Sequence, residues 1–221
     1  MRMFPRAIRL MSATILLLGG VALPPLPATG EPIAFKMLSN YSRATFKTDA
    51  LLETIVGTTA GPGVTGTVTV DPAKPQGATG IIRVDLTTVN SGVAKRDADM
   101  RGPDYLDTAN EANRYAVFEV KGVAMAGPFE PGKEIHAKVT GILTIKGKAV
   151  ERVVDARVTY LRLTPQQLEN HKRFGYTEDV LRVRVKFDTT FTNHGMQVPQ
   201  YLLLKVSNDI QLETDLTLVR Q

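Results

Sequence analysis

The chain has 221 residues, of which 43% are hydrophobic and 22% are charged. This composition suits one large domain or two small ones with an apolar core, and it excludes a disordered tail and a polytopic membrane protein. The chain contains no cysteine, which excludes a disulfide scaffold, a thiolate zinc site, a cysteine nucleophile and a lipid-modified N-terminal cysteine. Three histidines leave little for metal binding or general-base chemistry.

The first 22 residues have the pattern of a secretory signal peptide. Arg2, Arg6 and Arg9 precede an apolar run over residues 10–23, which is too short to span a bilayer, and small residues follow within and after it. We expect cleavage after Ala22, with a cut at 28–30 or an uncleaved anchor as alternatives. Residues 23–32 are then expected to form a flexible N-terminal segment, and the domain lies outside the cytoplasm.

Cleavage of this segment also changes the charge of the protein. The formal net charge is +5, and removal of three arginines lowers it to 5 − 3 = +2. Nucleic-acid binding requires a concentrated basic patch, and the remaining sequence has none. We therefore expect no nucleic-acid partner, and no stable membrane span once the signal peptide is removed.

Apolar and polar residues alternate with a period of two along most of the remaining chain, which predicts β-strands with one dry face. The clearest run is 181–191, where apolar residues alternate with Arg182, Arg184 and Lys186. Turn residues such as Asp71-Pro72 and Gly127-Pro128 separate the runs. In chain order the expected strands cover residues 44–47, 64–71, 82–86, 115–121, 135–140, 141–146, 150–162, 181–191 and 206–218.

Two stretches interrupt this pattern. Residues 96–107 are polar and predict a short helix followed by a loop. Thr164, Pro165 and Gln167 form a helix start, because Thr164 can cap the helix, Pro165 suits its first position and Gln167 completes a capping box. This second helix should run to about Arg173 and end at Gly175.

About eight one-sided strands must bury their apolar faces, either as two stacked sheets or as a closed barrel that has no exposed edges. We expect an all-β fold, an antiparallel barrel of about eight strands with one or two short helices. A barrel of this size can hold one small ligand, or its side chains can fill its own interior. Strand periodicity alone favours neither alternative.

Several blocks in this order resemble the YceI-like family of secreted, lipocalin-like bacterial proteins that bind polyisoprenoid lipids. The block 141–147, Gly-Ile-Leu-Thr-Ile-Lys-Gly, is the most recognisable. Ala116 replaces a proline of the family pattern, and Tyr41-Ser42 stands where the family often has His-Ser. The other blocks are Ser42–Phe46, Leu51–Gly57, Val64–Gly66 with Val70-Asp71, Arg96–Asp107, Tyr115–Glu119 and Asn193–Met196.

The resemblance implies one up-and-down, lipocalin-like β-barrel domain over residues 33–221, located in the periplasm or secreted. It implies an apolar lipid of polyisoprenoid type as the ligand, in a role of transport, storage or stress tolerance, with no cofactor. A long apolar guest gains about 25 cal/mol per Å² of buried surface, so an apolar lining can bind tightly. The ligand-binding residues that we expect are Phe46, Val84, Arg96, Asp97, Tyr105, Phe118, Tyr160, Phe187 and Phe191.

Arg96 and Asp97 have two interpretations: one of them orients a lipid head group at the barrel mouth, or both fix the loop to the barrel. Asp97, Asp99, Asp104 and Asp107 form an acidic cluster, but the spacing fails the EF-hand template, so we expect no metal. No Gly-x-Ser-x-Gly motif is present, so we expect no catalytic residue and no enzymatic activity.

The three histidines have structural interpretations. His194 could be a polar residue at the rim of the barrel, while we expect His136 and His171 to face water. The alternative function is a non-catalytic periplasmic interaction or stress-related module with a filled barrel. In that case the outward row of Arg182, Arg184 and Lys186 could bind an anionic partner. A homodimer is left open.

Overall fold

The computed structural model describes residues 31–71, 73–125, 130–201 and 204–221. The predicted signal peptide, most of the N-terminal segment expected over 23–32, and the turn expected at Gly127-Pro128 lie outside these residues. In the described part the chain forms thirteen strands and two α-helices, α1 (Ala94–Arg101) and α2 (Pro165–His171). The strands are β1 (Ile33–Met37), β2 (Arg43–Asp49), β3 (Thr54–Thr59), β4 (Val64–Val70), β5 (Thr79–Asp85), β6 (Val89–Asn90), β7 (Tyr115–Met125), β8 (Glu134–Ile145), β9 (Lys148–Arg162), β10 (Asp179–Thr190), β11 (Gln200–Tyr201), β12 (Leu204–Lys205) and β13 (Asp209–Arg220).

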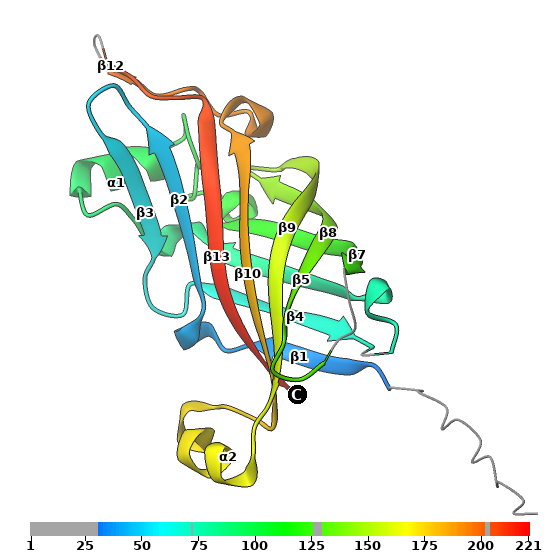
Figure 1. Cartoon of the computed structure of the whole chain (residues 1–221). Helices are drawn as coiled ribbons and strands as arrows, with labels where there is room; N and C mark the ends of the chain where they lie inside the picture. Colours follow the sequence, from blue (N-terminus) through cyan, green and yellow to red (C-terminus); the bar gives the residue numbers. More distant parts are fainter. Residues whose placement is uncertain (1–30, 72, 126–129, 202–203) are drawn as a thin grey trace, which may run out of the picture.

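Eight of these strands close into a barrel, in the order β1-β4-β5-β7-β8-β9-β10-β13. The end of β13 pairs with β1 and closes the barrel, with Met37 opposite Leu218. The first half of β13 pairs instead with β2, with Phe46 opposite Leu212, and β3 and β6 continue the sheet from there. Every pairing is antiparallel. The structure confirms the predicted all-β fold, a closed antiparallel barrel with two short helices (Figure 1).

The strands differ from the prediction in several places, and the alternation did not predict β3 or the two-residue strands β6, β11 and β12. The runs expected at 135–140 and 141–146 form the single strand β8, because Gly141 continues the extended ladder opposite Val120 rather than ending it. Strand β1 was not predicted, although Ile33, Phe35 and Met37 alternate with smaller or charged residues. A five-residue strand carries too short an alternating signal to stand out in sequence.

Helix α2 begins as predicted. The Gln167 amide donates a hydrogen bond to Thr164 Oγ1 at 3.3 Å, and the Thr164 amide donates one to Gln167 Oε1 at 2.9 Å, which completes the capping box. A 3-10 turn follows to Phe174, and Gly175 then adopts a left-handed conformation with φ of 87°. Glycine adopts this conformation without steric cost, which explains why the helical segment ends there.

The outer face of the barrel is charged and its inner face is apolar. The side chains of Arg182, Arg184 and Lys186 on β10 point outward, and each pairs with a carboxylate on β13 or β8. Arg182 pairs with Asp215 at 3.1 Å and Lys186 pairs with Glu213 at 3.3 Å, while Arg184 pairs with Glu134. The dry face predicted for 181–191 therefore lies inside the barrel, as the alternation indicates.

One end of the barrel, which we call the closed end, is sealed by buried groups. Phe35 is fully buried there, and the Asp179 carboxylate is 1% exposed. Asp179 accepts a hydrogen bond from the Tyr160 hydroxyl at 2.6 Å and one from Arg220 Nη1 at 2.9 Å. Burial, together with the hydrogen bond to the Asp179 carboxylate, raises the pKa of Tyr160 to about 12, so Tyr160 remains a donor at any physiological pH.

Candidate ligand-binding cavity

The barrel encloses a cavity of about 700 Å³, which lies in the size range of small-molecule sites. Its lining is mostly aliphatic and aromatic and comes from every barrel strand except β1. Phe46, Phe118 and Phe187 point inward and pack against buried core residues, yet they are only half-buried, because part of each ring faces the hollow. The interior is therefore hollow, and the alternative of a barrel filled by its own side chains is wrong.

Two glycines allow bulky rings to lie against the barrel wall. A Cβ atom at Gly57 would lie 2.2 Å from the Phe46 ring, and one at Gly141 would lie 2.5 Å from the Phe118 ring. These distances are far below a van der Waals contact, so each ring occupies the space above a glycine. The two rings therefore cover the wall rather than crossing the cavity, which preserves its volume.

Two hydroxyls on the cavity wall, those of Thr48 and Thr189, have hydrogen-bond partners within the protein. The Thr48 hydroxyl donates a hydrogen bond to the Asp209 carbonyl at 2.9 Å. Thr189 Oγ1 accepts a hydrogen bond from Arg152 Nη2 at 3.2 Å and lies 2.8 Å from His194 Nε2. Because these hydroxyls already have partners, they offer little to a polar ligand, and the middle of the cavity is suited to hydrocarbon.

His194 is fully buried, so the expectation that it lies at the rim is wrong. The 3-10 turn Thr192–His194 folds back against β9, where His194 Nδ1 lies 3.3 Å from the Lys148 carbonyl. A carbonyl only accepts, so Nδ1 carries the proton and Nε2 accepts from the Thr189 hydroxyl. Burial lowers the pKa of His194, and the nearby Arg152 charge lowers it further. The hydrogen bond with the Lys148 carbonyl raises the pKa, but the net change is downward. The imidazole is therefore held neutral.

The cavity reaches solvent beside helix α1, at an opening that we call the mouth. Glu53, Lys95 and Asp99 line the cavity there although their side chains are 57%, 79% and 56% exposed. Arg96 also lines it and donates from Nη1 to Glu53 Oε1 at 3.0 Å. Figure 1 shows α1 beside β2 and β3, at the end of the barrel away from α2. The charged side chains that surround the mouth are thus joined in ion pairs.

Asp97 holds the loop before α1 and does not line the cavity. Its Oδ1 accepts hydrogen bonds from the Ser91 amide at 2.8 Å and from the Ser91 hydroxyl at 2.6 Å. Burial alone would raise the pKa of Asp97, but these hydrogen bonds and the nearby Arg101 and Arg96 charges bring it below its ordinary value. The carboxylate stays ionised and fixes the loop, as one of the two interpretations from the sequence proposed.

Most of the residues expected to bind a ligand face the cavity. The Tyr160 side chain does not, because its hydroxyl is drawn to Asp179 at the closed end. Sequence reasoning missed the small residues Ala44 and Ala116, whose positions two before Phe46 and Phe118 would have placed them on the same face. The expected residues that line the cavity are Phe46, Val84, Arg96, Tyr105, Phe118, Phe187 and Phe191.

The acidic residues near α1 do not converge. Asp99 pairs with Lys95 at 2.9 Å, and Asp107 accepts a hydrogen bond from Asn113 Nδ2 at 3.0 Å, while Asp97 binds Ser91. In the ranges that the structure describes, no three His, Cys, Asp or Glu residues gather as metal ligands would. The carboxylates of Asp97, Asp99 and Asp107 each have a local structural partner instead.

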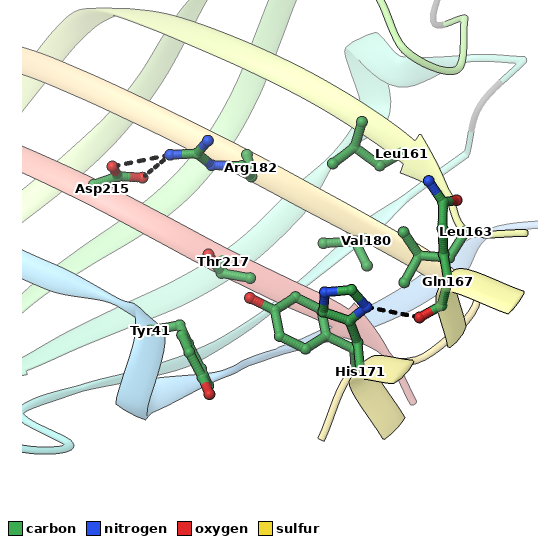
Figure 2. A pocket seen from close by; sticks show the side chains of 10 residues that line it. Tyr41, Leu161, Leu163, Gln167, His171, Val180, Arg182, Asp215 and Thr217 are labelled. Carbon is green, nitrogen blue, oxygen red and sulfur yellow. Dashed lines mark hydrogen bonds and ion pairs between the residues drawn. The ribbon is translucent and has the colours of Figure 1, made fainter. Parts of the chain in front are cut away.

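A second pocket, of about 470 Å³, lies outside the barrel between α2 and the outer faces of β9, β10 and β13. Figure 2 shows its lining, with the Arg182–Asp215 ion pair at one side and the His171 Nδ1 hydrogen bond to the Gln167 carbonyl at the other. The rings of Tyr41 and Tyr176 lie 5.5 Å apart beside it. This pocket is open and mixed in polarity, in contrast to the apolar interior.

None of the helices in the described ranges has the length and hydropathy needed to cross a bilayer. No curated protein sequence matches the chain. Solved structures match its fold, with identities too low to show more than that. The crystal structure of BcnA from Burkholderia cenocepacia aligns with a TM-score of 0.59 and 20% identity, covering 80% of this chain and 95% of that one.

Two further structures share the fold. A polyisoprenoid binding domain from Saccharophagus degradans, implicated in plant cell wall breakdown, aligns with a TM-score of 0.61 and 13% identity over 86% of this chain and 99% of that one. The YceI protein of Campylobacter jejuni aligns with a TM-score of 0.56 and 15% identity over 76% of this chain and 85% of that one. A model of the YceI-like domain matches residues 35–218, nearly the whole barrel, and the chain therefore belongs to the YceI-like family.

Proposed function

We propose that the protein binds a long apolar lipid of polyisoprenoid type inside the barrel and carries or stores it outside the cytoplasm. The observation that carries this proposal is the apolar cavity of about 700 Å³ with a solvent-exposed mouth. The role is binding rather than catalysis: the ligand is held by exclusion of water from its hydrocarbon chain, at about 25 cal/mol per Å² of buried surface.

The choice of a polyisoprenoid chain is supported by family membership and by the Saccharophagus degradans domain, whose structure is described as polyisoprenoid binding. The cavity chemistry agrees with that class of ligand. Its wall combines branched aliphatic side chains with the Phe118 and Phe187 rings, whose centroids lie 6.3 Å apart. A methyl-branched chain can pack against such a wall without hydrogen-bond partners.

We assign the ligand contacts to Phe46, Val84, Phe118, Phe187 and Phe191 along the wall and to Tyr105 near the mouth. Arg96 would meet the polar end of the lipid, because it lines the cavity at the mouth and its charge is already positioned by Glu53. The segment 96–107 would act as the lid, since it includes the end of α1 and places Met100, Tyr105 and Leu106 over the cavity.

The location outside the cytoplasm is proposed from the pattern of residues 1–22, with Arg2, Arg6 and Arg9 before a short apolar run. The same role would be served in the periplasm or after secretion. It requires a carrier because a polyisoprenoid chain has almost no solubility in the aqueous space between membranes.

The experiment has two parts. The full-length protein is purified from the cells that produce it, and bound lipid is identified by organic extraction and native mass spectrometry. The purified protein is then loaded with a polyprenyl lipid. A bound lipid in the wild type is expected, and Val183→Phe, which fills the cavity from β10, should lower the bound amount at least fivefold. Val153→Phe is the matched control, because Val153 is 60% exposed on the outer face of the barrel. No lipid recovered from cells and none bound on loading would overturn the proposal.

The alternative of an anionic partner on the outer basic row has little support from the geometry. Arg182, Arg184 and Lys186 each pair with a carboxylate of another strand, and Lys186 shares its partner Glu213 with Lys47. Binding an anion there would require breaking these ion pairs.

A further inference from the structure

The turn between β2 and β3 exposes two large apolar side chains. Leu51 and Leu52 are 75% and 80% exposed, more than any other large hydrophobic residue in the described part of the chain. Isolated exposed leucines on a protein surface need no explanation, but two adjacent ones at the tip of a turn form a protruding apolar surface. Val93, which is 48% exposed, lies at the start of α1.

The backbone of this turn is held in place, so the leucines are presented rather than free to fold inward. The Ala50 amide donates a hydrogen bond to the Glu53 carbonyl at 2.8 Å. The Thr54 hydroxyl donates one to Asp49 Oδ1 at 2.7 Å, and the Ser207 amide donates one to the Asp49 carbonyl at 2.6 Å. These bonds fix the turn from both sides of its tip.

The leucine tip adjoins the cavity directly. Ala50 before it and Glu53 and Ile55 after it line the cavity, and Val93 lines the cavity while remaining exposed. The apolar lining therefore continues through the mouth to the outer surface at Leu51 and Leu52. A lipid chain leaving the cavity along this path would meet the apolar side chains of Ala50, Ile55 and Val93 beside the Glu53–Arg96 ion pair before it reached the tip.

Four charged side chains at the mouth, beside the tip, form two ion pairs. Lys95 pairs with Asp99, and Arg96 pairs with Glu53, so the mouth presents no excess of either sign from these groups. A surface of this kind is suited to the interfacial region of a bilayer, which accepts leucine side chains among the head groups and tolerates paired charges beside them. It does not require anionic lipid.

We propose that Leu51 and Leu52 insert into the surface of a lipid bilayer and bring the mouth of the barrel against the membrane. This inference rests on the proposed function, because it supplies the step at which a lipid enters or leaves the cavity. The occupant of the apolar tip is the bilayer itself. Docking would let the lipid chain pass between membrane and cavity without crossing water.

The test is flotation of the protein without its predicted signal peptide, residues 1–22, on two kinds of vesicle. One kind is pure phosphatidylcholine, and the other contains one fifth phosphatidylglycerol. Wild-type protein should float with both kinds of vesicle. The double variant Leu51→Ser, Leu52→Ser should bind both at least tenfold more weakly and should transfer a fluorescent polyprenyl lipid between vesicles correspondingly more slowly. Val153→Ser on the outer face of the barrel is the matched control and should behave as the wild type.

The outcomes separate this inference from the proposed function. If lipid is bound in solution but wild type and double variant float equally, or neither floats, docking by the leucines is wrong and the binding function stands. The double variant should retain the lipid that it carries from cells, because neither leucine lines the cavity. If the substitutions abolish a dimer measured by sedimentation and leave flotation unchanged, the tip is a contact between copies and the inference is overturned.

Discussion

The two ends of the barrel use the same pair of chemical groups in opposite ways. At the closed end the Asp179 carboxylate is 1% exposed and meets the Arg220 guanidinium at 2.9 Å. At the mouth the Glu53 carboxylate is 57% exposed and meets the Arg96 guanidinium at 3.0 Å. The distances are nearly equal, so the difference between the two pairs lies in their access to water.

Water access decides what each pair contributes. A buried carboxylate requires its partners, because without them the desolvated charge has no compensation. Water and salt screen the attraction within an exposed ion pair. The energy gained from that attraction is therefore little more than the side-chain entropy lost in forming the pair. The closed end is thus a stability element, whereas opening the mouth should cost little, as the proposed entry of a lipid requires.

The largest effect is expected from removing the carboxylate at the closed end. Asp179→Ala leaves the Tyr160 hydroxyl without its partner inside the barrel, and we expect the free energy of unfolding to fall by about 2–4 kcal/mol. Arg220 is 52% exposed and can rehydrate, which keeps the loss below that of a fully buried pair. Urea denaturation followed by circular dichroism measures the change.

Asp188→Ala is the matched control on the same strand, because Asp188 is exposed and its substitution should cost less than about 0.5 kcal/mol. Tyr160→Phe should lie between the two, at about 1 kcal/mol, since it removes one hydrogen bond and leaves the Asp179–Arg220 pair intact. If the Asp179→Ala variant were as stable as the control, the closed end would not contribute more to stability than the mouth does.

Most of the barrel wall could be predicted from the sequence, whereas the buried contacts at the closed end and the hollow interior could not. Alternation fixes which residues of a strand face inward, and it identified the strand at 181–191 and the lining residues Phe46, Phe118 and Phe187. It does not specify whether the inward side chains meet in the middle. The hollow interior depends on the placement of Phe46 and Phe118 over Gly57 and Gly141, which follows from pairing register and is not visible in one strand.

The same limit explains the errors at particular residues. Tyr160 lies at an inward-facing position in the alternating pattern of its strand. Its hydroxyl, however, is bound by Asp179, which is nineteen positions away in the sequence. His194 lies in a polar segment, which suggested exposure, but the turn that carries it folds onto β9. Polar partners brought together by the tertiary fold have no local signature. Capping of α2 was predicted correctly because Thr164 and Gln167 are three residues apart.

Acid should destabilise the fold through His194. Burial holds the pKa of His194 below its unfolded value of about 6.5. As the pH falls below that value, the unfolded chain binds the proton first, so the free energy of unfolding decreases. Its value from urea denaturation should be lower at pH 5 than at pH 7, and His194→Gln should reduce this difference.

His136→Gln is the control substitution for that measurement, because His136 is exposed on β8 and lies outside the buried contacts of His194. The carboxylates whose pKa values are lowered, such as Asp97 and Glu213, lose their contribution only at more acidic pH. Equal slopes for the wild type and His194→Gln between pH 7 and pH 5 would contradict the assignment of a neutral, buried imidazole.

A single methyl group on the wall should reduce lipid binding with little effect on either end. Gly57→Ala places a Cβ within 2.2 Å of the Phe46 ring, which must swing into the cavity. We expect two- to fivefold less bound lipid after loading, and a change in unfolding free energy below about 1 kcal/mol, because the ring moves more easily than backbone. Gly122→Ala on β7 meets open space and should leave loading unchanged.

The smallest effect should come from the ion pair at the mouth. Glu53→Gln removes the charge opposite Arg96, but the Glu53 side chain is more than half exposed and Arg96 keeps a hydrogen bond from Nε to Ser91 Oγ at 2.9 Å. We therefore expect a change in unfolding free energy of less than about 0.5 kcal/mol in urea denaturation. Lipid exchange with vesicles should become faster, because this pair joins α1 to the turn that carries Leu51 and Leu52. A loss of stability as large as that of Asp179→Ala would show that the mouth is held as firmly as the closed end, and unchanged exchange would mean that the pair does not restrain opening.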